Sequence, residues 1–556
     1  MESPTGTAVL PVLEAFFQHE REHPQRTYLI QPLADGTRQE FSWAEVGRQA
    51  RRFAGWLARQ ELPVGSHIAI LSKNCAHWII ADLGIWMAGH VSVPVQPTHT
   101  PTALRQVIEH AETRMVIVGK LDGWAQLRTG LPVQLPWVGL PLAATDAHLL
   151  PWAQLQRDAL PLQHPVARHS SDLATIMYSS GTTGLAKGCM LSFDSMYFAA
   201  KNFLRLFLTT DQDRVLSWLP LSHIAERQFI EMQSLLSGMT VYFANSRETF
   251  IRDIRRARPT LFLGTPSTWH QIRQGVREQL QQRLLSRAVS IPLLSRRAAL
   301  RLLGQMGLDR VRFAVVCCDT TPAPVMDWYH RLGIRLFEIY GLTENCGYSH
   351  VGRPGRFRPG WCGLPNPGVE SRVDEHGELL VRSQAAMLGY FRNPQCTETV
   401  FDEQGFLRTG DRAEIDQEGF LRLSGRMSDL FQTAEGRQVV PQPIEHGLLI
   451  HPLIEYACVV GEGLPQPLAL LALTETGRGM PRHEVDAQLQ SLLHQLNSRL
   501  AAHEQLACLV VCSELWAHDN ETITATLRLR RGVVRARYHE RLGDWLVNGA
   551  DIVWES

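Results

Sequence analysis

The segment YSSGTTGLAKGCMLS, residues 178–192, carries the strongest structural signal in this chain. A strand-like apolar run, residues 173–178, precedes it, and an apolar and aromatic run, residues 190–198, follows it. Its glycines let a ligand approach the backbone, its successive N–H groups can form an anion-binding concavity, and Lys187 adds a charge suited to phosphate. A Walker A loop is excluded, because Gly188 stands where that motif requires Ser or Thr. In isolation the segment also fits a flexible surface loop, so both interpretations stay open at this point.

The composition is that of an ordinary globular protein. The 556 residues include 44% apolar and 20% charged residues, and Lys plus Arg equals Asp plus Glu at 55 each. A balanced charge gives no field that would attract nucleic acid, so no nucleic-acid partner is expected. No window offers about 18 uncharged apolar residues, and the N-terminal residues lack a basic signal-peptide region, so neither a transmembrane segment nor secretion is expected. Ten cysteines without regular spacing predict reduced thiols and a cytoplasmic location.

Apolar periodicity predicts alternating helices and strands through much of the chain. Ser42 and Glu45 predict a capping box at the start of a helix whose apolar face carries Val46, Ala50 and Phe53. Strands are expected at residues 67–71, 91–95, 115–118, 241–244, 261–263, 311–316 and 336–339, and helices at residues 78–88 and from Pro101, capped by Thr100. This alternation predicts a parallel sheet covered on both faces. The proline-rich segment 131–169 is expected to be an irregular connection.

The pattern changes to short alternating strands after Gly368. Strands are expected at residues 378–382 and 420–424, each beside a turn signal. Beyond Gly425 a final unit is expected to hold a helix at residues 485–500 and an Arg-rich terminal helix at residues 532–546.

Three further strings carry groups suited to a nucleotide. EIYGLTEN (338–345) offers Tyr340 as a flat face for a base, Thr343 for phosphate and Glu344 for Mg²⁺. TGD (409–411) places Asp411 in a turn where it can pair with ribose hydroxyls, and GRMSD (425–429) places Arg426 within reach of ribose or phosphate. Taken singly, the first string also fits a strand-end turn and the second an ordinary Asx turn.

Taken in order along the chain, these strings resemble the adenylate-forming (AMP-binding) enzyme superfamily, and within it the long-chain acyl-CoA synthetase branch. The resemblance covers nearly the whole chain, with further matches in LSKNCAHWIIADLGIWMAG (71–89), LPLSHIAER (219–227), ARPTLFLGTPSTW (257–269), MLGYFRNP (387–394) and VVPQPIE (439–445). It implies an α/β fold with a large N-terminal domain, residues 1–424, made of two doubly wound α/β subdomains plus a small β-barrel. A smaller, mobile α+β C-terminal domain, residues 425–556, is implied to follow a hinge near Ser428.

The resemblance also implies a two-step ligase reaction that uses ATP, Mg²⁺ and CoA. A hydrophobic, medium- to long-chain carboxylic acid attacks the α-phosphorus of ATP, and the thiol of CoA then displaces AMP. Carried over position by position, the residues that bind the nucleotide are Ser179, Ser180, Gly181, Thr182, Thr183, Gly184, Lys187, Asp319, Tyr340, Gly341, Thr343, Asp411 and Arg426. The implied metal-binding residues are Thr182 and Glu344, and the implied catalytic residues are Lys187, His223, Glu344 and Arg528. Judged on its own surroundings in the sequence, His223 also fits a hydrogen-bonded loop histidine.

Three positions depart from the family pattern. Arg528, in TATLRLRR (524–531), replaces the family's C-terminal catalytic lysine, and a planar guanidinium is not equivalent to an ammonium where geometry decides. The adenine loop VCCDTTP (316–322) has Cys317, Cys318 and Asp319 where small residues are usual, although Asp319 could accept the adenine amino group. Gln432 replaces a lysine that some members use in the thiol step.

Three functions therefore stay open on the sequence. The leading hypothesis is an acid–CoA ligase, and the second is a ligase that loads an acyl carrier protein. The third is a catalytically impaired nucleotide- or acyl-binding homologue, motivated by Arg528 and by the altered adenine loop. A long acyl substrate also leaves peripheral membrane contact open.

Overall fold

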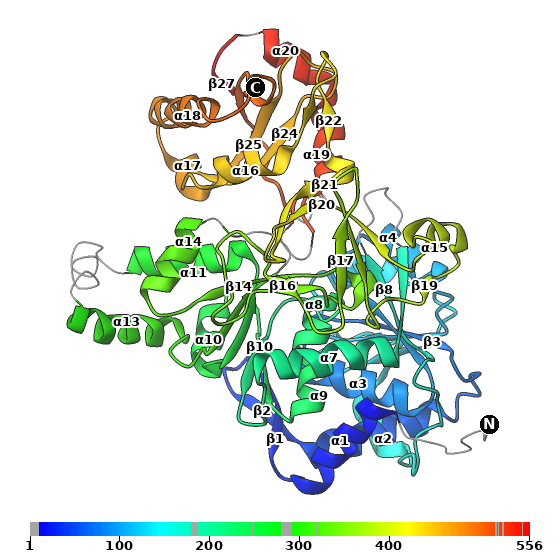
Figure 1. Ribbon diagram of the computed structural model, residues 1–556. Coiled ribbons are helices and arrows are strands. Elements are labelled where there is room, and N and C mark those ends of the chain that lie inside the picture. Colours follow the sequence, from blue (N-terminus) through cyan, green and yellow to red (C-terminus); the bar gives the residue numbers. More distant parts are fainter. Residues whose placement is uncertain are drawn as a thin grey trace.

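The computed structural model describes residues 10–179, 187–246, 248–279, 292–317, 321, 323–517, 520, 522–524, 528–547 and 549–555. Within these residues the chain forms a large N-terminal part and a separate C-terminal lobe, drawn from yellow to red at the top of Figure 1. Mixed α/β sheets build the N-terminal part and a smaller α+β unit follows, which confirms the predicted fold class.

The largest sheet has the strand order β19-β9-β8-β4-β3-β5-β6-β7. Neighbours from β8 to β7 pair in parallel, whereas β9 and β19 add an antiparallel edge. The bounds are β3 (His67–Leu71), β4 (Val91–Val95), β5 (Met115–Val118), β6 (Trp137–Gly139), β7 (Leu149–Pro151), β8 (Leu173–Ser179), β9 (Lys187–Ser192) and β19 (Gly389–Tyr390). The predicted strands at residues 67–71, 91–95 and 115–118 are confirmed with the same bounds.

Helices pack on this sheet as the alternating pattern predicts. All residues of α3 (Ala76–Met87) are buried, because the helix packs between β3, β4 and α2 (Trp43–Leu57). The predicted capping box of α2 is only half confirmed: the Ser42 hydroxyl accepts a hydrogen bond from the Glu45 N–H at 3.2 Å. The Glu45 carboxylate instead binds Arg48, an i+3 neighbour on the same helix face.

The segment 131–169 is more ordered than its prolines predict. The structure forms β6, β7 and α6 (Trp152–Asp158) there, so the expectation of an irregular connection is wrong. The two strands are only three residues long, and the one that contains a proline, β7, is the edge strand, where proline costs few ladder hydrogen bonds.

Two further sheets complete the α/β part. One has the order β10-β11-β1-β2 and contains β1 (Thr27–Pro32), β2 (Arg38–Ser42), β10 (Arg214–Ser217) and β11 (Thr240–Phe243). The other has the order β12-β13-β14-β15-β16, parallel from β12 to β14, and contains β12 (Leu261–Gly264), β13 (Phe313–Val316), β14 (Leu336–Tyr340), β15 (His350–Val351) and β16 (Leu364–Pro365). The strands predicted at residues 241–244, 261–263, 311–316 and 336–339 are thus confirmed within two residues.

A four-stranded antiparallel sheet stands where the resemblance implies the barrel. Its order is β17-β18-β20-β21, with β17 (Glu370–Val373), β18 (Glu378–Arg382), β20 (Leu407–Ile415) and β21 (Leu421–Arg426). The register of β20 and β21 sets Asp411 directly opposite Arg426. Asp411, predicted to bind ribose, and Arg426, predicted to bind ribose or phosphate, therefore become cross-strand neighbours.

The described helices of the N-terminal part are mostly short. Besides α2, α3 and α6 they are α1 (Pro11–Glu22), α4 (Pro101–His110), α5 (Trp124–Leu127), α7 (Phe193–Phe207), α8 (Ile224–Glu226), α9 (Gln233–Ser237), α10 (Phe250–Ala257), α11 (Pro266–Gln279), α13 (Pro292–Met306), α14 (Ala323–Arg331) and α15 (Pro394–Val400). A turn of π-helix, η2 (Arg227–Met232), joins α8 to α9. The predicted cap of α4 is confirmed, since Thr100 accepts a hydrogen bond from the Ala103 N–H.

The C-terminal lobe follows a short 3-10 turn, η4 (Met427–Asp429). Its sheets are β22-β23 and β24-β25-β26-β27, formed by β22 (Phe431–Gln432), β23 (Gln438–Val439), β24 (Ile454–Val460), β25 (Leu468–Leu473), β26 (Leu509–Val511) and β27 (Ile552–Trp554). Its helices are α16 (Pro441–Leu449), α17 (Glu475–Gly479), α18 (Arg482–Asn497), α19 (Arg531–Tyr538) and α20 (Leu542–Val547). Two apolar clusters cover the larger sheet, and both contain only residues from Phe431 onward.

The terminal helix differs from its prediction. A 3-10 turn, His539–Arg541, separates α19 from α20, so the single helix expected at residues 532–546 is wrong. Val534, Tyr538, Leu542 and Trp545 are nevertheless all buried in one cluster. These residues are spaced by four, four and three, which is the spacing of one face of a regular helix, so the apolar pattern runs through the 3-10 turn.

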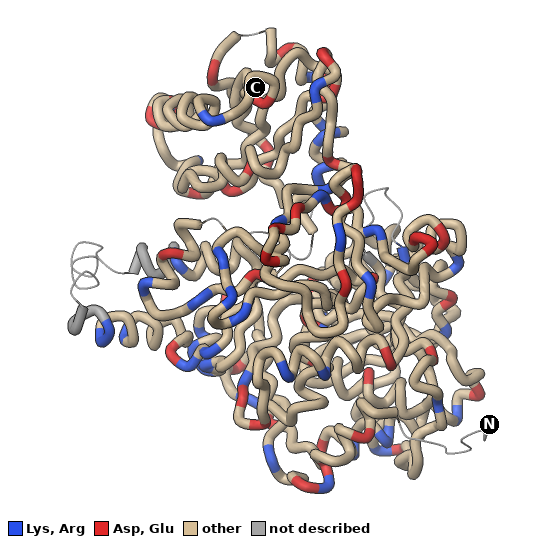
Figure 2. Tube along the Cα trace, viewed as in Figure 1, with Lys and Arg blue, Asp and Glu red and all other residues tan. Residues whose placement is uncertain are grey.

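Charges of both signs are mixed along the described chain, as Figure 2 shows. Both signs also occur where the C-terminal lobe meets the N-terminal part. Arg426, Arg528, Arg530 and Arg531 line the cleft described below. Among the described residues no helix combines the length and the apolar character that a membrane span requires.

Candidate active site

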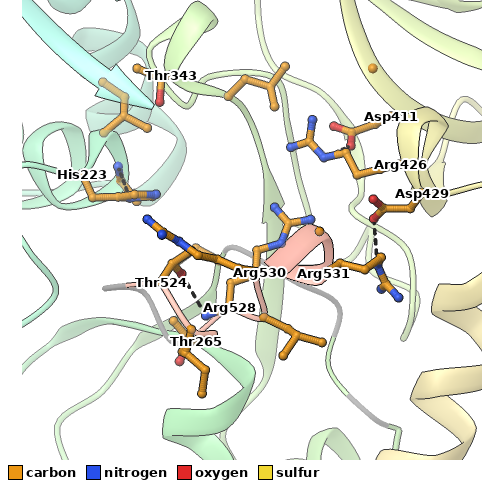
Figure 3. A pocket seen from close by; sticks show the side chains of 18 of the residues that line it. His223, Thr265, Thr343, Asp411, Arg426, Asp429, Thr524, Arg528, Arg530 and Arg531 are labelled. Carbon is orange, nitrogen blue, oxygen red and sulfur yellow. Dashed lines mark hydrogen bonds and ion pairs between the residues drawn. The ribbon is translucent and has the colours of Figure 1, made fainter. Parts of the chain in front are cut away.

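A cleft of about 2290 Å³ lies between the N-terminal part and the C-terminal lobe. Its walls are formed by the carboxyl ends of β12 and β14, the turn after β14, strand β20, and residues 523–524 and 528–533. Figure 3 labels ten of the lining residues. Ligands of open α/β sheets commonly bind outside the carboxyl ends of the parallel strands, and this cleft has that position.

Tyr340, Asp411 and Arg426 form one connected polar group in the cleft. The Tyr340 hydroxyl donates to Asp411 Oδ2 at 2.6 Å, and Arg426 Nε lies 2.9 Å from Asp411 Oδ1. Burial, reinforced by the Asp411 carboxylate, raises the pKa of Tyr340 well above its usual range, so the phenol stays protonated and donates. Asp411 is therefore oriented by two partners while each of its oxygens keeps a lone pair for a further donor, such as a ribose hydroxyl.

Tyr390 contacts both Glu344 and Lys187. The Tyr390 hydroxyl donates to Glu344 Oε1 at 2.7 Å, and Lys187 Nζ lies 5.1 Å from the centre of the Tyr390 ring, within cation–π range. Tyr390 belongs to the string MLGYFRNP but is not among the predicted site residues. It reaches the site because β19 pairs with β9, which sets Tyr390 opposite Cys189 beside the lysine.

The groups around Glu344 show whether it suits a magnesium ion. Among the described residues no group of three or more His, Cys, Asp or Glu side chains could hold a metal by itself. Magnesium in nucleotide sites is usually held by one or two carboxylates together with substrate phosphates and water. A single carboxylate beside Lys187 fits that arrangement, so Glu344 is a suitable ligand, whereas Thr182 lies outside the described residues.

The turn after β14 is shaped by two glycines. A Cβ on Gly341 would lie 2.2 Å from the carbonyl carbon of Gly347, so only glycine fits there. The Leu342 N–H donates to Asn345 Oδ1 at 2.8 Å and closes the turn. Thr343 and Glu344 consequently line the cleft, and Figure 3 shows the Thr343 side chain at its upper edge.

His223 faces the cleft as a neutral imidazole. It precedes α8, and its Nδ1 accepts a hydrogen bond from the Ala225 N–H at 3.2 Å. Burial, with a smaller effect from the Arg528 charge, lowers the pKa of His223 to about 4. The sequence left two alternatives for His223, a hydrogen-bonded loop histidine or a residue that lines the substrate site. In the structure His223 is hydrogen-bonded and also lines the cleft.

Arg528 and Arg530 project from a short antiparallel pairing in the C-terminal lobe. Ile523 bridges Leu529, and the Arg530 N–H donates to the Thr522 carbonyl at 2.7 Å. Residues two apart in an extended segment share one face, so both arginines line the cleft (Figure 3). Within the part of the chain that the structure describes, neither guanidinium has an ion-pair partner, whereas neighbouring Arg531 binds Asp429 at 3.1 Å and Glu445.

Every predicted site residue whose side chain the structure describes lines the cleft: Lys187, His223, Tyr340, Thr343, Glu344, Asp411, Arg426 and Arg528. Gly341, which has no side chain, lines it as well. Ser180, Gly181, Thr182, Thr183, Gly184 and Asp319 lie outside the described residues, as does the side chain of Ser179. Sequence reasoning missed Tyr390, Arg530 and Gln228, which also line the cleft. The alternation LRLR around Arg528 could have indicated Arg530, because period-two spacing sets both arginines on one face.

Comparisons with known proteins agree with one another. A model of the AMP-binding enzyme family matches residues 16–391, and a model of the AMP-binding enzyme C-terminal domain matches residues 428–543. The chain is 27% identical to a protein of Mycobacterium bovis named long-chain-fatty-acid–CoA ligase FadD15, over 94% of each chain. It is 28% identical to the long-chain-fatty-acid–CoA ligase ACSBG2 of Gallus gallus, over 78% of this chain and 64% of that one. Its fold is similar to that of the anthranilate CoA ligase AuaEII in complex with anthranoyl-AMP, with a TM-score of 0.79, 22% identity and coverage of 96% and 98%.

Proposed function

Because this chain belongs to the AMP-binding enzyme family and is an AMP-forming ligase of the acyl-CoA synthetase type, we propose that it joins a hydrophobic, medium- to long-chain carboxylic acid to CoA. The relatives named as long-chain-fatty-acid–CoA ligases support the acid and the acceptor. The observation that carries the proposal is the meeting of Lys187, Glu344, Asp411 and Arg528, from both parts of the chain, at one cleft.

In the first step a carboxylate oxygen of the acid bonds to the α-phosphorus of ATP, and the bond to pyrophosphate breaks. Negative charge gathers on the phosphate oxygens, so cationic and hydrogen-bonding groups stabilise this step. We assign that role to Lys187 and Arg528, with Glu344 holding Mg²⁺, which when bound would neutralise charge on the phosphates. Tyr340 and Gly341 would lie against adenine, Asp411 would bind ribose, and Arg426 would bind ribose or phosphate.

His223 has a different part in the proposed step. With a pKa of about 4 it is neutral near pH 7, so it offers a hydrogen bond to the acid without adding a charge. Neutrality also avoids repulsion with Arg528, whose charge contributes to the low pKa.

In the second step the CoA thiol attacks the acyl carbonyl, and AMP leaves. We propose that residues 425–556 rotate about a hinge near Ser428 between the two steps, so that one cleft serves both reactions. Ser428 lies in η4, where Asp429 binds Arg531 at 3.1 Å. Gln432 does not line the cleft among the described residues, so it has no assigned role in the first step.

Two measurements test the proposed function. Exchange of pyrophosphate into ATP, measured with a panel of acids of increasing chain length, is expected to be stimulated by hydrophobic acids. Thioester formation is expected with CoA and not with a phosphopantetheinyl carrier protein. Faster transfer to the carrier protein would favour the second hypothesis from the sequence, and no exchange with any acid would favour a nucleotide-binding protein without ligase activity.

A further inference from the structure

Gln228 is a buried amide in the wall of the cleft. It lies in the π-turn η2, five residues after His223, and only 1% of its surface is exposed. The neighbouring cleft wall is apolar, with Phe203, Ile224 and Phe229 also lining it. An uncharged but strongly polar group thus stands among hydrocarbon side chains.

The amide of Gln228 is not satisfied by the protein. In the described part of the chain neither its Nε2 nor its Oε1 makes a regular hydrogen bond, although the thiol of Cys346 lies close enough to interact with the amide. The polar group beside it is the thiol of Cys346, whose pKa burial raises to about 12, and a protonated thiol is only a weak partner. Buried amides without partners are uncommon and costly, so each one calls for a reason.

The backbone that carries Gln228 is held firmly. The preceding residue, Arg227, is fully buried, with Nη2 2.7 Å from Asp82 Oδ2 and Nη1 3.5 Å from Glu231 Oε2. Its guanidinium carbon lies 5.0 Å from the ring centre of Trp78 and 5.3 Å from that of Trp86. A π-turn inserts an extra residue into the helix, and such turns occur often at functional sites. With Arg227 anchored on one side, Gln228 is directed to the cleft.

Gln233 offers a comparison within the same helical segment. It is also fully buried, but its Oε1 accepts a hydrogen bond from the Thr209 hydroxyl at 3.0 Å, and it does not line the cleft. In the described part of the chain the Nε2 of Gln233 has no hydrogen-bond partner, so this amide is half satisfied, whereas neither group of the Gln228 amide is hydrogen-bonded. The less satisfied amide belongs to the position that lines the cleft.

We infer that Gln228 binds a hydrogen-bonding substituent on the body of the acid, so that the preferred substrates are hydrophobic acids with a hydroxyl, oxo or amino group away from the carboxylate. This inference rests on the proposed ligase function and narrows its substrate class. An amide carries both a donor and an acceptor, so it can pair with any of these groups. A site built to hydrogen-bond a substrate group discriminates strongly against the analogue that lacks it.

The test compares matched acids that differ by one group. The positional series of hydroxydodecanoic acids is measured against dodecanoic acid, and the hydroxybenzoic acids against benzoic acid, by pyrophosphate exchange. For at least one substituted acid we expect kcat/KM to exceed that of its unsubstituted partner by about tenfold or more. In the Q228L variant that ratio should fall to about one, with exchange on the unsubstituted acid maintained or increased.

The variant Q233L is the matched control, because it removes a buried amide of the same segment that lies outside the cleft. It should lower thermal stability while leaving the preference for the substituted acid unchanged. If no substituted acid exceeds its partner, or if Q228L keeps the wild-type ratio, the inference is wrong although the ligase function stands. If no acid supports exchange at all, the proposed function fails first, and the inference fails with it.

Discussion

The Asp411 carboxylate holds two neighbours at once, the Tyr340 hydroxyl at 2.6 Å and Arg426 Nε at 2.9 Å. Asp411→Asn leaves one oxygen in place of two and presents an NH₂ group to one of these two donors. We expect the KM for ATP to rise about tenfold or more, since hydrogen bonds to charged groups contribute about 1.5–3 kcal/mol each. Pyrophosphate-exchange kinetics at varied ATP concentration measure this.

Asp416→Asn is the control for that experiment. Asp416 caps the turn of the same sheet and binds Arg358, but it does not line the cleft. Its substitution can reduce stability but should leave the KM for ATP unchanged. Equal effects of the two substitutions would contradict a specific role of Asp411 in nucleotide binding.

Arg528 is the residue on which the efficiency of adenylation is expected to depend most. Its guanidinium faces the cleft without an ion-pair partner among the described residues, so it is free to meet an anion. Arg528→Ala should lower pyrophosphate exchange about 100-fold, which corresponds to about 2.7 kcal/mol in the barrier. Arg528→Lys should change it by less than tenfold, because the charge is kept.

Arg537→Ala is a suitable control, since Arg537 is paired with Glu514 and does not line the cleft. A tenfold or greater gain in exchange from Arg528→Lys would mean that arginine impairs the site. It would then favour the third hypothesis from the sequence, a homologue with compromised chemistry.

At the scale of elements, the π-turn η2 depends on one buried ionic group. Burial raises the pKa of both Glu231 and Asp82, and the Arg227 charge opposes that shift at each carboxyl. Arg227→Leu would leave Asp82 buried without its cation. We expect a loss of about 3–5 kcal/mol in the free energy of unfolding, measured by urea denaturation.

The exposed Arg205 on α7 provides the matched substitution, because no ion pair holds it among the described residues. Arg205→Leu should change stability by about 0.5 kcal/mol or less. If Arg227→Leu is equally mild, the ionic group does not hold the turn, and the orientation of Gln228 needs another explanation.

The whole molecule should lose stability in mild acid because several histidines are buried as neutral groups. Burial lowers the pKa of His77, His99 and His223 to about 4 and that of His350 to about 3. In the unfolded chain each would take up a proton near pH 6.5. Between pH 6.5 and pH 4 the unfolded state therefore binds more protons, and the free energy of unfolding falls as the pH drops. From pH 7 to pH 5 we expect about 2 kcal/mol per histidine.

Urea denaturation at pH 7 and pH 5 tests this expectation. His77→Phe should remove about one histidine's share of the change, because His77 packs against Phe41 and Trp152 and a phenyl ring can take its place. The exposed His376→Gln should leave the difference between the two pH values unaltered. An unchanged pH dependence in His77→Phe would count against a neutral buried histidine.

Local patterns in the sequence predict the regular parts of the fold well. The strands at residues 67–71, 91–95, 115–118 and 378–382 have the predicted bounds, because each is a compact run of strand-forming residues beside a turn. The errors lie where the surroundings decide. Pairing onto β5 makes strands of β6 and β7 despite the surrounding prolines, and a 3-10 turn interrupts the terminal helix at residues 539–541.

The sequence by itself determined the family, the fold class and a set of residues, from Lys187 to Arg528, that meet at one cleft, because these depend on strings of neighbouring residues that can be compared directly. Tertiary structure alone decided that Tyr390 links Lys187 to Glu344 and that the face shared by Arg528 and Arg530 lies at the cleft. It also decided that the Gln228 amide makes no regular hydrogen bond within the described residues. The physical reason is that a contact, or its absence, depends on segments distant in the sequence, such as those around Lys187, Glu344 and Tyr390, that only packing brings together. The residue type shows which groups a side chain can bind, and the fold determines which of those groups the protein itself supplies and which a ligand can still meet.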